Sequence, residues 1–274
     1  MTTISHEWAD AIDSWATSLR AAGRAESSIR TRTDHLHWLA SWASPRSPWA
    51  LSLTDLNEWT GSKTWARETR RSVRASMRSF FAWAVQSGHL EASPAIDLAS
   101  IKPGAPRPHP TPDAEYRAAL ERAPERERLM LRLAAEYGMR RAEVAQVHTD
   151  DVSFGSRGYT LLVHGKGDRE RELPLRHDDA GKILDLGPGF IFPGEDAGHL
   201  SPRWVGTIIA RRLPGQWTMH SLRHRFATRA YALNRDTFVV QELLGHASPA
   251  TTRLYVLLPD DAKRDVINRL GDAA

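Results

Sequence analysis

Apolar residues in the first hundred positions recur at the spacing of amphipathic helices. The clearest stripe advances by four, three and four residues and consists of Trp8, Ile12, Trp15 and Leu19. A second helix is expected over about 29–42, with Ser27 or Ser28 as its N-cap. A short third helix is expected over 54–59, and a fourth over about 65–87 with Gly88 as its C-terminal stop. This region is therefore predicted to be all helical.

The fourth predicted helix has two unlike faces. Its buried face should consist of Val73, Met77, Phe80 and Ala84. On much of the opposite side, guanidinium groups recur at three- and four-residue steps, and they belong to Arg67, Arg70, Arg71, Arg74 and Arg78. Glu68 is the only acid among them. A row of cations of this kind fits an ordinary solvated helix face, and it also fits an electrostatic footprint for duplex DNA.

Helical and strand patterns alternate beyond residue 112. Helices are expected over 114–123 and 125–137, the second ending at Gly138. Two strands over 159–164 and 169–175 should form a hairpin around the turn 165–168. Further helices are expected over about 176–185, 201–212, 221–233, 236–244, 249–257 and 260–270. The predicted fold class is mostly α with a small antiparallel β-sheet.

Residues 100–112 separate these two regions. The segment contains five prolines and one glycine, which do not fit a helix or a central strand, so a semi-rigid extended linker is expected. The 274 residues suit two domains of ordinary size, each with its own core. We therefore expect a helical domain over 1–99 and a mixed domain over 113–274 that ends in a tail helix.

Composition narrows the function less than the patterning does. There are 37 Lys and Arg against 33 Asp and Glu, so the net charge of +4 does not by itself indicate a nucleic-acid binder. The absence of cysteine excludes disulfides and thiol chemistry and agrees with a cytoplasmic protein. The N-terminus lacks a signal pattern, and no apolar run is long enough for a membrane span.

A series of cationic residues leads up to one tyrosine in the second domain. The segments are Gly138-Met139-Arg140 with Glu143, Gly165-Lys166-Gly167, His220-Ser221-Leu222-Arg223, Leu243-Leu244-Gly245-His246 and Thr251-Thr252-Arg253-Leu254-Tyr255. An arginine fork binds two phosphate oxygens at once, histidine can hold or pass a proton near neutral pH, and tyrosine is an oxygen nucleophile. No cluster has metal-ligand spacing, so side chains must supply the positive charge, and neither a metal nor a cofactor is expected.

In order, spacing and local sequence these segments resemble the tyrosine recombinases, the lambda-integrase, Cre and Xer superfamily. The family pattern is Arg, then Lys on a β-turn, then His-x-x-Arg, then Leu-Gly-His, and then Tyr nine residues after that His. In this sequence it is filled by Arg140, Lys166, His220, Arg223, His246 and Tyr255. The resemblance covers roughly residues 113–260 strongly and roughly 1–100 weakly.

The resemblance implies that the first groups of this pattern act on the phosphate and the leaving oxygen. Arg140 and Arg223 would hold the non-bridging oxygens of the scissile phosphate, and Glu143 would help to orient the site. Lys166 would protonate the departing 5′ oxygen. The ordinary alternatives are that Arg140 only pairs with Glu143 and that Lys166 is a solvated turn residue.

The resemblance implies that the remaining residues provide and assist the nucleophile. His220 would accept or orient the tyrosine proton, and His246 would pack at the site and bond the phosphate. Tyr255 would attack the phosphate to give a 3′-phosphotyrosyl bond, although a core tyrosine on an amphipathic helix is the ordinary alternative. His224 is expected to be structural and to point away from His220.

With these motifs downstream, DNA contact becomes the preferred role for the arginine row on the fourth helix. Arg169, and with it Arg171, are further candidates for contacts with the DNA backbone because they follow the lysine turn. The expected partners are double-stranded DNA and three further copies of the chain. A directionality factor or a host DNA-bending factor is an additional candidate partner.

The resemblance implies a site-specific DNA recombinase that clamps duplex DNA between its domains and exchanges strands through a Holliday junction. Integration and excision of a mobile element such as a prophage is the leading role. A Xer-like resolvase of replicon dimers is the alternative, since the sequence leaves no room for a separate arm-binding domain before residues 1–20. A type IB topoisomerase and a DNA-binding regulator without activity are rivals from other classes.

The predicted tail helix has a small apolar face made of Val266, Ile267 and Leu270. It is expected either to fold back onto its own domain or to dock on a neighbouring protomer. The resemblance favours docking on the neighbour.

Overall fold

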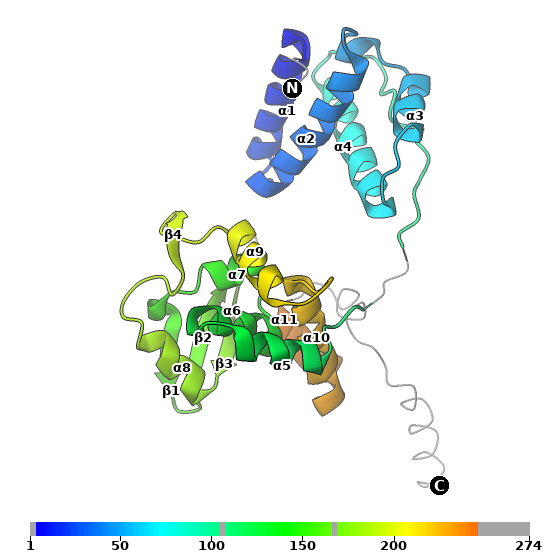
Figure 1. Cartoon of the computed structure of the whole chain (residues 1–274). Coiled ribbons are helices and arrows are strands. Elements are labelled where there is room, and N and C mark those ends of the chain that lie inside the picture. The colour runs from blue at the N-terminus through cyan, green and yellow to red at the C-terminus, as the bar shows by residue number, and fades with distance from the viewer. Residues whose placement is uncertain (1–3, 105–107, 166–168, 246–274) are drawn as a thin grey trace, which may run out of the picture. The chain divides into compact units, whose positions relative to one another are not determined.

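The computed structural model describes residues 4–104, 108–165 and 169–245 (Figure 1). The chain divides into two compact units, Met1–Ala105 and Pro106–Ala274. Both are mainly helical, and the second contains a three-stranded antiparallel sheet, which confirms the predicted fold class. In the part of the chain that the structure describes, no helix has the length and apolar character that a membrane span requires.

The first unit is a set of helices around an aromatic core (Figure 1). Its helices are α1 (His6–Ala21), α2 (Glu26–Ala43), α3 (Leu53–Gly61) and α4 (Arg67–Gln86), with a 3-10 turn at Pro48–Ala50. Trp8, Trp15, Trp59, Phe80 and Phe81 are fully buried. All four predicted helices are confirmed, and the recurring tryptophans fill the core.

The start of α2 differs from the prediction. The helix begins at Glu26, with Ala25 as its N-cap and no side-chain hydrogen bond at that position. The predicted N-cap at Ser27 or Ser28 is therefore wrong. Glu26 places a negative charge in the first turn, which stabilises a helix N-terminus without a serine cap.

The apolar face of α4 is confirmed. Val73, Met77, Phe80 and Ala84 are all inaccessible to solvent. Gly88 follows the helix with a φ of +77°. Glycine adopts this left-handed conformation without strain, which is why the helix ends here.

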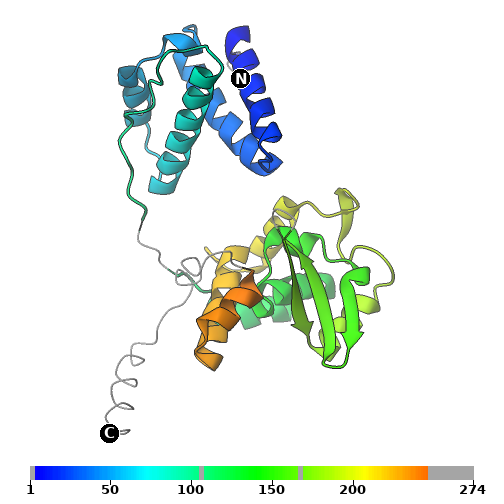
Figure 2. The same cartoon turned by 180° about the vertical axis from the view of Figure 1, so that it is seen from behind.

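The second unit packs its helices on one side of the small sheet (Figure 2). Its helices are α5 (Asp113–Arg122), α6 (Glu125–Glu136), α7 (Arg141–Ala145), α8 (His177–Leu184), α9 (Pro202–Arg212), α10 (Met219–Asn234) and α11 (Thr237–Leu244). The strands are β1 (Val152–Gly155), β2 (Gly158–His164), β3 (Glu170–Leu175) and β4 (Pro193–Asp196), and a 3-10 turn spans Thr149–Asp151. β1, β2 and β3 pair antiparallel in that order.

Short elements account for most of what the prediction missed. α7 has five residues, and β1 and β4 have four residues each with most side chains exposed, so none carries an apolar repeat. α10 begins at Met219, before the predicted 221, because the Thr218 N–H donates to the Ser221 hydroxyl at 2.8 Å and so starts the helix earlier. The helices predicted over 249–257 and 260–270 lie outside the described residues.

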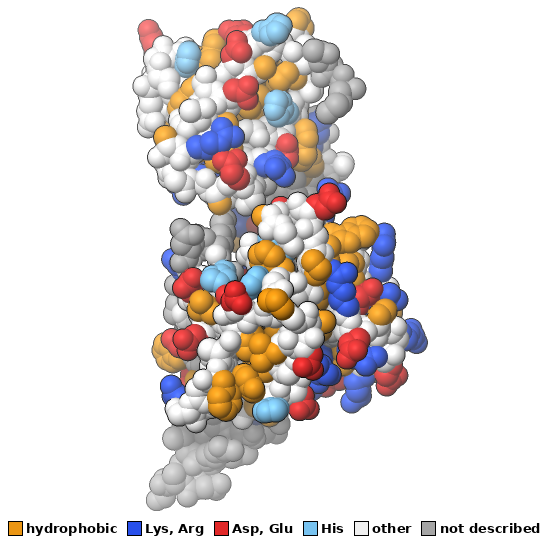
Figure 3. Space-filling model, turned by 90° about the vertical axis from the view of Figure 1, so that its left-hand side faces the viewer, with side chains coloured by type: hydrophobic (Ala, Val, Ile, Leu, Met, Phe, Trp, Pro, Cys, Tyr) orange, Lys and Arg blue, Asp and Glu red, His pale blue; other side chains and the backbone are white. Residues whose placement is uncertain are grey.

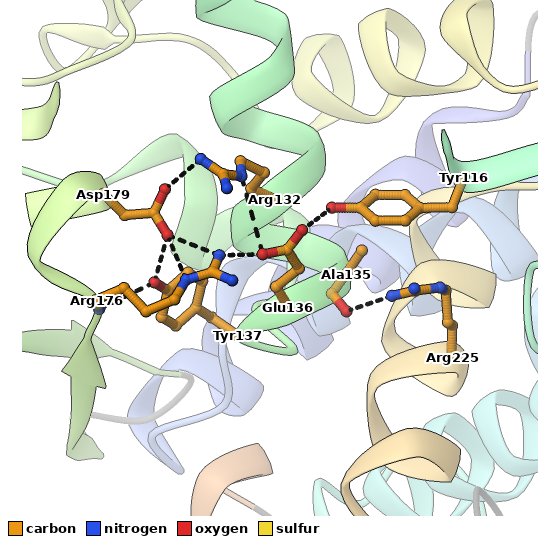
Figure 4. Close-up of polar contacts among 8 residues, drawn as sticks. All are labelled: Tyr116, Arg132, Ala135, Glu136, Tyr137, Arg176, Asp179 and Arg225. Atoms are coloured by element: carbon orange, nitrogen blue, oxygen red, sulfur yellow. Dashed lines mark hydrogen bonds and ion pairs between the residues drawn. The ribbon is translucent and has the colours of Figure 1, made fainter. Parts of the chain in front are cut away.

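A buried polar network fixes the end of α6 (Figure 4). Asp179 of α8 is inaccessible to solvent and accepts hydrogen bonds from Arg132 at 2.7 Å and from the Tyr137 hydroxyl at 2.6 Å. Arg225 of α10 donates to the Ala135 carbonyl at 3.2 Å. The network ties α8 and α10 to the last turn of α6, immediately before the Gly-Met-Arg motif.

The described ends of the proline-rich segment are attached to their own units. In the first unit, the Gly104 N–H donates to Glu68 Oε1 of α4 at 3.3 Å. In the second unit, Thr111 is buried, its N–H donates to the Ser221 carbonyl at 3.1 Å, and the two hydroxyls pair at 2.7 Å. Thr111 is therefore part of the second unit, and the predicted linker is anchored on α10 before it reaches residue 112.

Charged side chains of both signs lie among one another at the surface. On the face shown in Figure 3, basic and acidic side chains are interspersed over both units. This agrees with the small net charge of +4. This face therefore shows no large field of a single sign, and local geometry is the better guide to a functional site.

Candidate active site

A tight turn between α6 and α7 carries Arg140. Gly138 has a φ of +66°, and a Cβ at this position would lie 2.5 Å from Phe226 Cδ1 and 2.9 Å from Leu244 Cδ2. Real side chains do not approach this closely, so only glycine fits between α10 and α11. The turn places Arg140 at the N-cap of α7, with its backbone extended.

Replacing Gly138 by alanine is expected to lower the free energy of unfolding by about 2–4 kcal/mol, because backbone strain and overpacking add. Urea denaturation monitored by circular dichroism measures this decrease. Gly187→Ala is the matched control, because Gly187 also has a positive φ, of +80°, but nothing lies within 4 Å of its Cβ position. Equal decreases in the two variants would contradict the close approach at Gly138.

Glu143 of α7 lies at the centre of the polar site and is only 3% exposed. Its carboxylate accepts hydrogen bonds from the Arg140 backbone N–H at 2.8 Å and from the Arg140 guanidinium at 2.7 Å. Arg171 of β3 donates to both carboxylate oxygens, at 3.1 and 2.8 Å. Arg223 Nη1 of α10 lies 4.0 Å from Glu143 Oε2. Three guanidinium groups therefore surround one buried carboxylate.

These partners keep Glu143 ionised. Burial opposes ionisation, but the hydrogen bonds and charge of Arg171, followed by the hydrogen bonds of Arg140, outweigh it and lower the pKa of Glu143 to about 2. Within this group three positive charges face one negative charge. The excess of positive charge suits a phosphate, whose oxygens are bound best by charged, bidentate donors.

The same three arginines hold the end of α11. The hydrogen bonds run from Arg171 Nε to the Leu243 carbonyl at 3.0 Å, from Arg223 Nη2 to the Leu244 carbonyl at 2.6 Å and from Arg140 Nη2 to the Gly245 carbonyl at 3.4 Å. The last carbonyls of a helix lack helical partners, and cations are favourable at this end. Gly245 closes α11 with a φ of +61°. The point where the chain continues toward His246 is thus fixed by the side chains around Glu143.

Arg223 is buried more deeply than its partner Arg140. The residue is 3% exposed, and its Nη1 donates to the Gly138 carbonyl while Nη2 binds at α11. The Arg140 side chain is 40% exposed. The Arg140 guanidinium is therefore the more accessible of the two, and the Arg223 guanidinium is held more rigidly.

His220 lies one turn before Arg223 on α10, at an exposed position. Its ring packs edge-on against the ring of His224, with 4.6 Å between the centroids. The expectation that His224 points away from His220 is therefore wrong, because residues four apart on a helix lie on the same face. Burial, followed by the charges of His220, His109 and Arg223, lowers the pKa of His224 to about 4. His224 is thus a neutral packing partner of His220.

The surroundings of His220 favour its neutral form. Although the residue is exposed overall, neighbouring atoms remove part of the water around its ring, and this desolvation, followed by the positive charge of Arg223, lowers its pKa below the ordinary 6.5. A neutral imidazole can accept a proton from a hydroxyl nucleophile. The rate of DNA cleavage is therefore expected to fall with a midpoint below pH 6.5, as His220 becomes protonated.

Single-turnover cleavage between about pH 5 and pH 8 tests this expectation, because the imidazole titrates in that range. In His220→Asn the overall cleavage rate should be lower, and its decrease at low pH (the acid limb of the pH profile) should be absent. A limb centred above pH 6.5, or one that persists unchanged in His220→Asn, would contradict the role given to this histidine.

A hydrogen bond joins β2 and β3 on either side of residues 166–168. The Gly165 N–H donates to the Arg169 carbonyl at 2.7 Å. His164, at the end of β2, contacts Asp151 at 2.9 Å and Glu170 at 3.0 Å, and these carboxylates, Asp151 first, raise its pKa. The described residues that flank Lys166 in the sequence, Gly165 and Arg169, are thus held together, and Arg169 is exposed.

Three predicted catalytic residues lie outside the described residues: Lys166, His246 and Tyr255. Among the predicted residues that are described, the structure brings Arg140, Glu143 and Arg223 together, with His220 one turn away on α10. The described chain also reaches Gly165 and Gly245, the residues directly before Lys166 and His246.

Arg171 belongs to this site, although its place in the sequence predicted a contact with the DNA backbone. Its side chain is 12% exposed and is engaged by Glu143, so the predicted contact with the DNA backbone does not fit its position. The alternation of residues in β3 could have predicted this position. Arg171, Leu173 and Leu175 lie on one side of the strand, and both leucines are buried.

The described tyrosines do not meet the needs of a nucleophile at this site. The Tyr116 hydroxyl donates to Glu136 at 2.5 Å, and burial followed by this bond raises its pKa. Burial, and then the bond to Asp179, raise the pKa of Tyr137 to about 12. Tyr159 packs against Phe154 on the sheet, and Tyr231 packs in a small apolar cluster with α11.

The arginine row of α4 is not a uniform line of solvated cations. Three of its members are half-buried and bind backbone carbonyls: Arg70 those of Lys63 and Trp65, Arg74 that of Leu98, and Arg78 that of Ile96. Arg71 pairs with Glu68 at 2.7 Å, and Arg67 is exposed. Arg67 and Arg71 therefore have the side chains best placed to reach a ligand while the backbone hydrogen bonds stay intact.

Comparisons with known proteins agree with the geometry. A family model described as "Phage integrase family" matches residues 113–261. The tyrosine recombinase XerC of Vibrio parahaemolyticus serotype O3:K6 (strain RIMD 2210633) is 30% identical over 265 residues, which cover 88% of this chain and 83% of that protein.

Two solved structures share the fold. A lambda integrase tetramer bound to a Holliday junction has a TM-score of 0.73 at 18% identity, over 93% of this chain and 78% of that chain. A lambda integrase dimer bound to a COC′ core site has a TM-score of 0.72 at 20% identity, over 92% of this chain and 77% of that chain.

Proposed function

The chain belongs to the phage integrase family and is a site-specific DNA recombinase of the tyrosine type, and from this premise we propose how its residues divide the reaction. Tyr255 is the nucleophile. Arg140 and Arg223 hold the scissile phosphate, with Glu143 orienting both. Lys166 protonates the departing 5′ oxygen, His220 accepts the tyrosine proton, and His246 packs at the site and bonds the phosphate.

The proposed reaction proceeds in two steps, strand cleavage and strand rejoining. The Tyr255 oxygen attacks phosphorus, its proton passes to His220, and the bond to the 5′ oxygen breaks as Lys166 supplies a proton to that oxygen. The product is a 3′-phosphotyrosyl bond and a free 5′-hydroxyl. A 5′-hydroxyl from the partner DNA then reverses the same steps, so strands are rejoined without an external energy source.

The observation that carries this proposal is the arrangement of Arg140, Arg171 and Arg223 around the buried Glu143. Attack on phosphorus increases negative charge on the non-bridging oxygens, and donors already in place stabilise that transition state more than the ground state. A buried, ionised carboxylate keeps these forks oriented before DNA arrives. Lys166, His246 and Tyr255 are assigned to the same site from their spacing in the sequence motifs.

We propose double-stranded DNA and a tetramer of this chain as the working assembly. The lambda integrase structures described above contain DNA, and one of them is a tetramer on a Holliday junction. Because its substrate is cellular DNA, the protein is proposed to act in the cytoplasm. Integration and excision of a mobile element is the proposed role, assisted by a directionality or DNA-bending factor. The 30% identity to a XerC protein supports a Xer-like resolvase as the second candidate.

A two-stage experiment first finds the DNA target and then tests the function. Covalent protein–DNA adducts are captured from sheared DNA of the source organism and sequenced to identify the site. A supercoiled plasmid carrying two copies of that site is then incubated with the protein. Deleted or inverted products are expected, whereas relaxation alone would indicate a topoisomerase, and binding without any strand cleavage would indicate a regulator. Either of these last results would overturn the recombinase assignment.

The α4 arginines are proposed to contact DNA phosphates chiefly through Arg67 and Arg71. The double variant Arg67→Ala/Arg71→Ala should weaken binding and reduce the slope of log K against log salt by about 0.9 for each phosphate that is no longer bound. Fluorescence anisotropy across a salt series measures the slope. Arg20→Ala is the control, because Arg20 is a surface arginine of the same unit that is paired with Glu26. An unchanged slope in the double variant would make this face an ordinary solvated surface.

A further inference from the structure

Arg171 contacts two separated parts of the site at once. Its two terminal nitrogens bind the Glu143 carboxylate at 3.1 and 2.8 Å. Its Nε binds the Leu243 carbonyl at the end of α11 at 3.0 Å. The planar guanidinium is needed for this arrangement, because an ammonium group cannot donate along three fixed directions in one plane.

The stem of Arg171 also lies against the residue that closes α11. A Cβ placed on Gly245 would be 3.0 Å from Arg171 Cδ. The chain leaves α11 at Gly245 toward His246 and Tyr255. Arg171 is therefore packed against the start of the segment that carries the nucleophile.

The backbone of Arg171 belongs to the β2–β3 hairpin, whose strands flank Lys166 in the sequence. Arg171 is opposite Val163 in the β2–β3 ladder, and the carbonyl of Arg169, two residues before it, accepts the hydrogen bond from the Gly165 N–H. One residue thus joins three elements: α7 with Glu143, the end of α11, and the β2–β3 hairpin.

The charge balance at Glu143 depends on this residue. Arg140, Arg171 and Arg223 face the carboxylate from α7, β3 and α10, and Arg171 is the partner with the largest favourable effect on its ionisation. Loss of Arg171 would raise the pKa of Glu143, because its hydrogen bonds and charge are the largest effects that oppose burial. A protonated Glu143 would hold the Arg140 fork less tightly, because the bond would no longer join two charged groups.

We propose that Arg171 is a positioning residue for DNA cleavage, which acts through Glu143 to set the two phosphate-binding arginines and fixes the end of α11 in the same step. The inference rests on the proposed function, because the reaction that it supports is cleavage by Tyr255. Arg171 does not itself touch the phosphate. Its effect is on the geometry of the groups that do.

The variants Arg171→Lys and Arg171→Gln test the proposal in the full-length chain. Single-turnover cleavage at saturating protein should fall by about a hundredfold, the cost of a misplacement of about 1 Å in an organised site, while DNA affinity stays within about twofold. Glu172→Gln is the matched control, because Glu172 is the next residue of β3, is exposed, and points to the other side of the strand. Thermal unfolding confirms that each variant is folded at the assay temperature, and Arg171→Lys alone carries the test if Arg171→Gln does not fold.

Two further measurements separate a positioning role from a general decrease in stability. In the Arg171 variants the cleavage rate should acquire a new acid limb, a decrease at low pH that the unaltered protein does not show at the same pH, because Glu143 becomes protonated more easily. A substrate with sulfur in place of the bridging 5′ oxygen does not need a proton from Lys166. It should leave the Arg171 defect unchanged, because that defect lies at the arginines.

Each outcome decides the proposal. Rescue by the sulfur substrate would place the effect of Arg171 at the lysine turn and overturn the route through Glu143. Wild-type cleavage rates in both Arg171 variants, or a defect without the new acid limb, would also overturn it. If the unaltered protein forms no adduct, the proposed function fails instead, so the two failures are distinguishable.

Discussion

Replacing Arg223 by lysine is expected to slow DNA cleavage by about a hundred- to a thousandfold, the usual cost of removing one oriented donor to a developing oxyanion. The Arg223 guanidinium spans the carbonyls of Gly138 and Leu244, and the residue is 3% exposed. A lysine keeps the charge but cannot bridge these two carbonyls and present a further N–H to phosphate. Single-turnover cleavage of a nicked site, compared with binding affinity, measures the effect.

The matched control is Arg229→Lys. Arg229 lies on the same helix, its side chain is 53% exposed, and it pairs with Asp113 at a distance from Glu143 and its arginines. Its conservative replacement should leave cleavage within about twofold, because exposed ion pairs contribute about 0–1 kcal/mol. Equal rates in Arg223→Lys and Arg229→Lys would remove Arg223 from the phosphate-binding pair.

Tyr255→Phe is expected to abolish the covalent protein–DNA adduct while DNA affinity stays near that of the unaltered protein. The change removes one oxygen and leaves the aromatic ring, so only the nucleophile is absent. Denaturing gel electrophoresis after incubation with a nicked site detects the adduct.

Tyr231→Phe serves as the control for that experiment, because Tyr231 is on α10 and packs in the apolar cluster with α11. It should form adducts at nearly the normal rate. An adduct that survives in Tyr255→Phe would show that another residue is the nucleophile.

The helices that the sequence predicted well are those whose apolar stripe is long. α1 and α4 bury their whole stripes, so a repeat of 3.6 residues was sufficient to find them. β1 is four residues long with mostly exposed side chains, and α7 is a single turn set by the bond between the Arg140 N–H and Glu143. A repeat of apolar residues along the sequence does not predict short elements such as these, which form because of contacts with distant parts of the chain.

The residues of the site also fall into those that the sequence predicted and those that only the folded structure reveals. Motif order predicted Arg140, Glu143 and Arg223, which the structure places in contact. The position of Arg171 depends on how β3 is paired and on where α11 ends, neither of which a motif records. In the row of α4 arginines the sequence pattern predicted too much. Their regular spacing indicated exposed cations, but Arg70, Arg74 and Arg78 bind nearby carbonyls.

The Gly138 turn was visible in the sequence only as a helix stop. Its second role depends on Phe226 and Leu244, which approach from α10 and α11 and lie far along the chain. The turn is therefore a packing constraint on the site as well as a break between two helices. Such constraints become visible only when the elements are placed in space.

The most direct measurement identifies the residue that becomes attached to DNA. The adduct trapped on a nicked site is digested with trypsin and nuclease, and mass spectrometry locates the remaining nucleotide. We predict a 3′-linked nucleotide on Tyr255, in the tryptic peptide 254–263 that follows Arg253. A nucleotide on any other residue, or the absence of a nucleotide-bearing peptide under conditions where DNA is cleaved, would contradict the assignment of Tyr255 as the nucleophile.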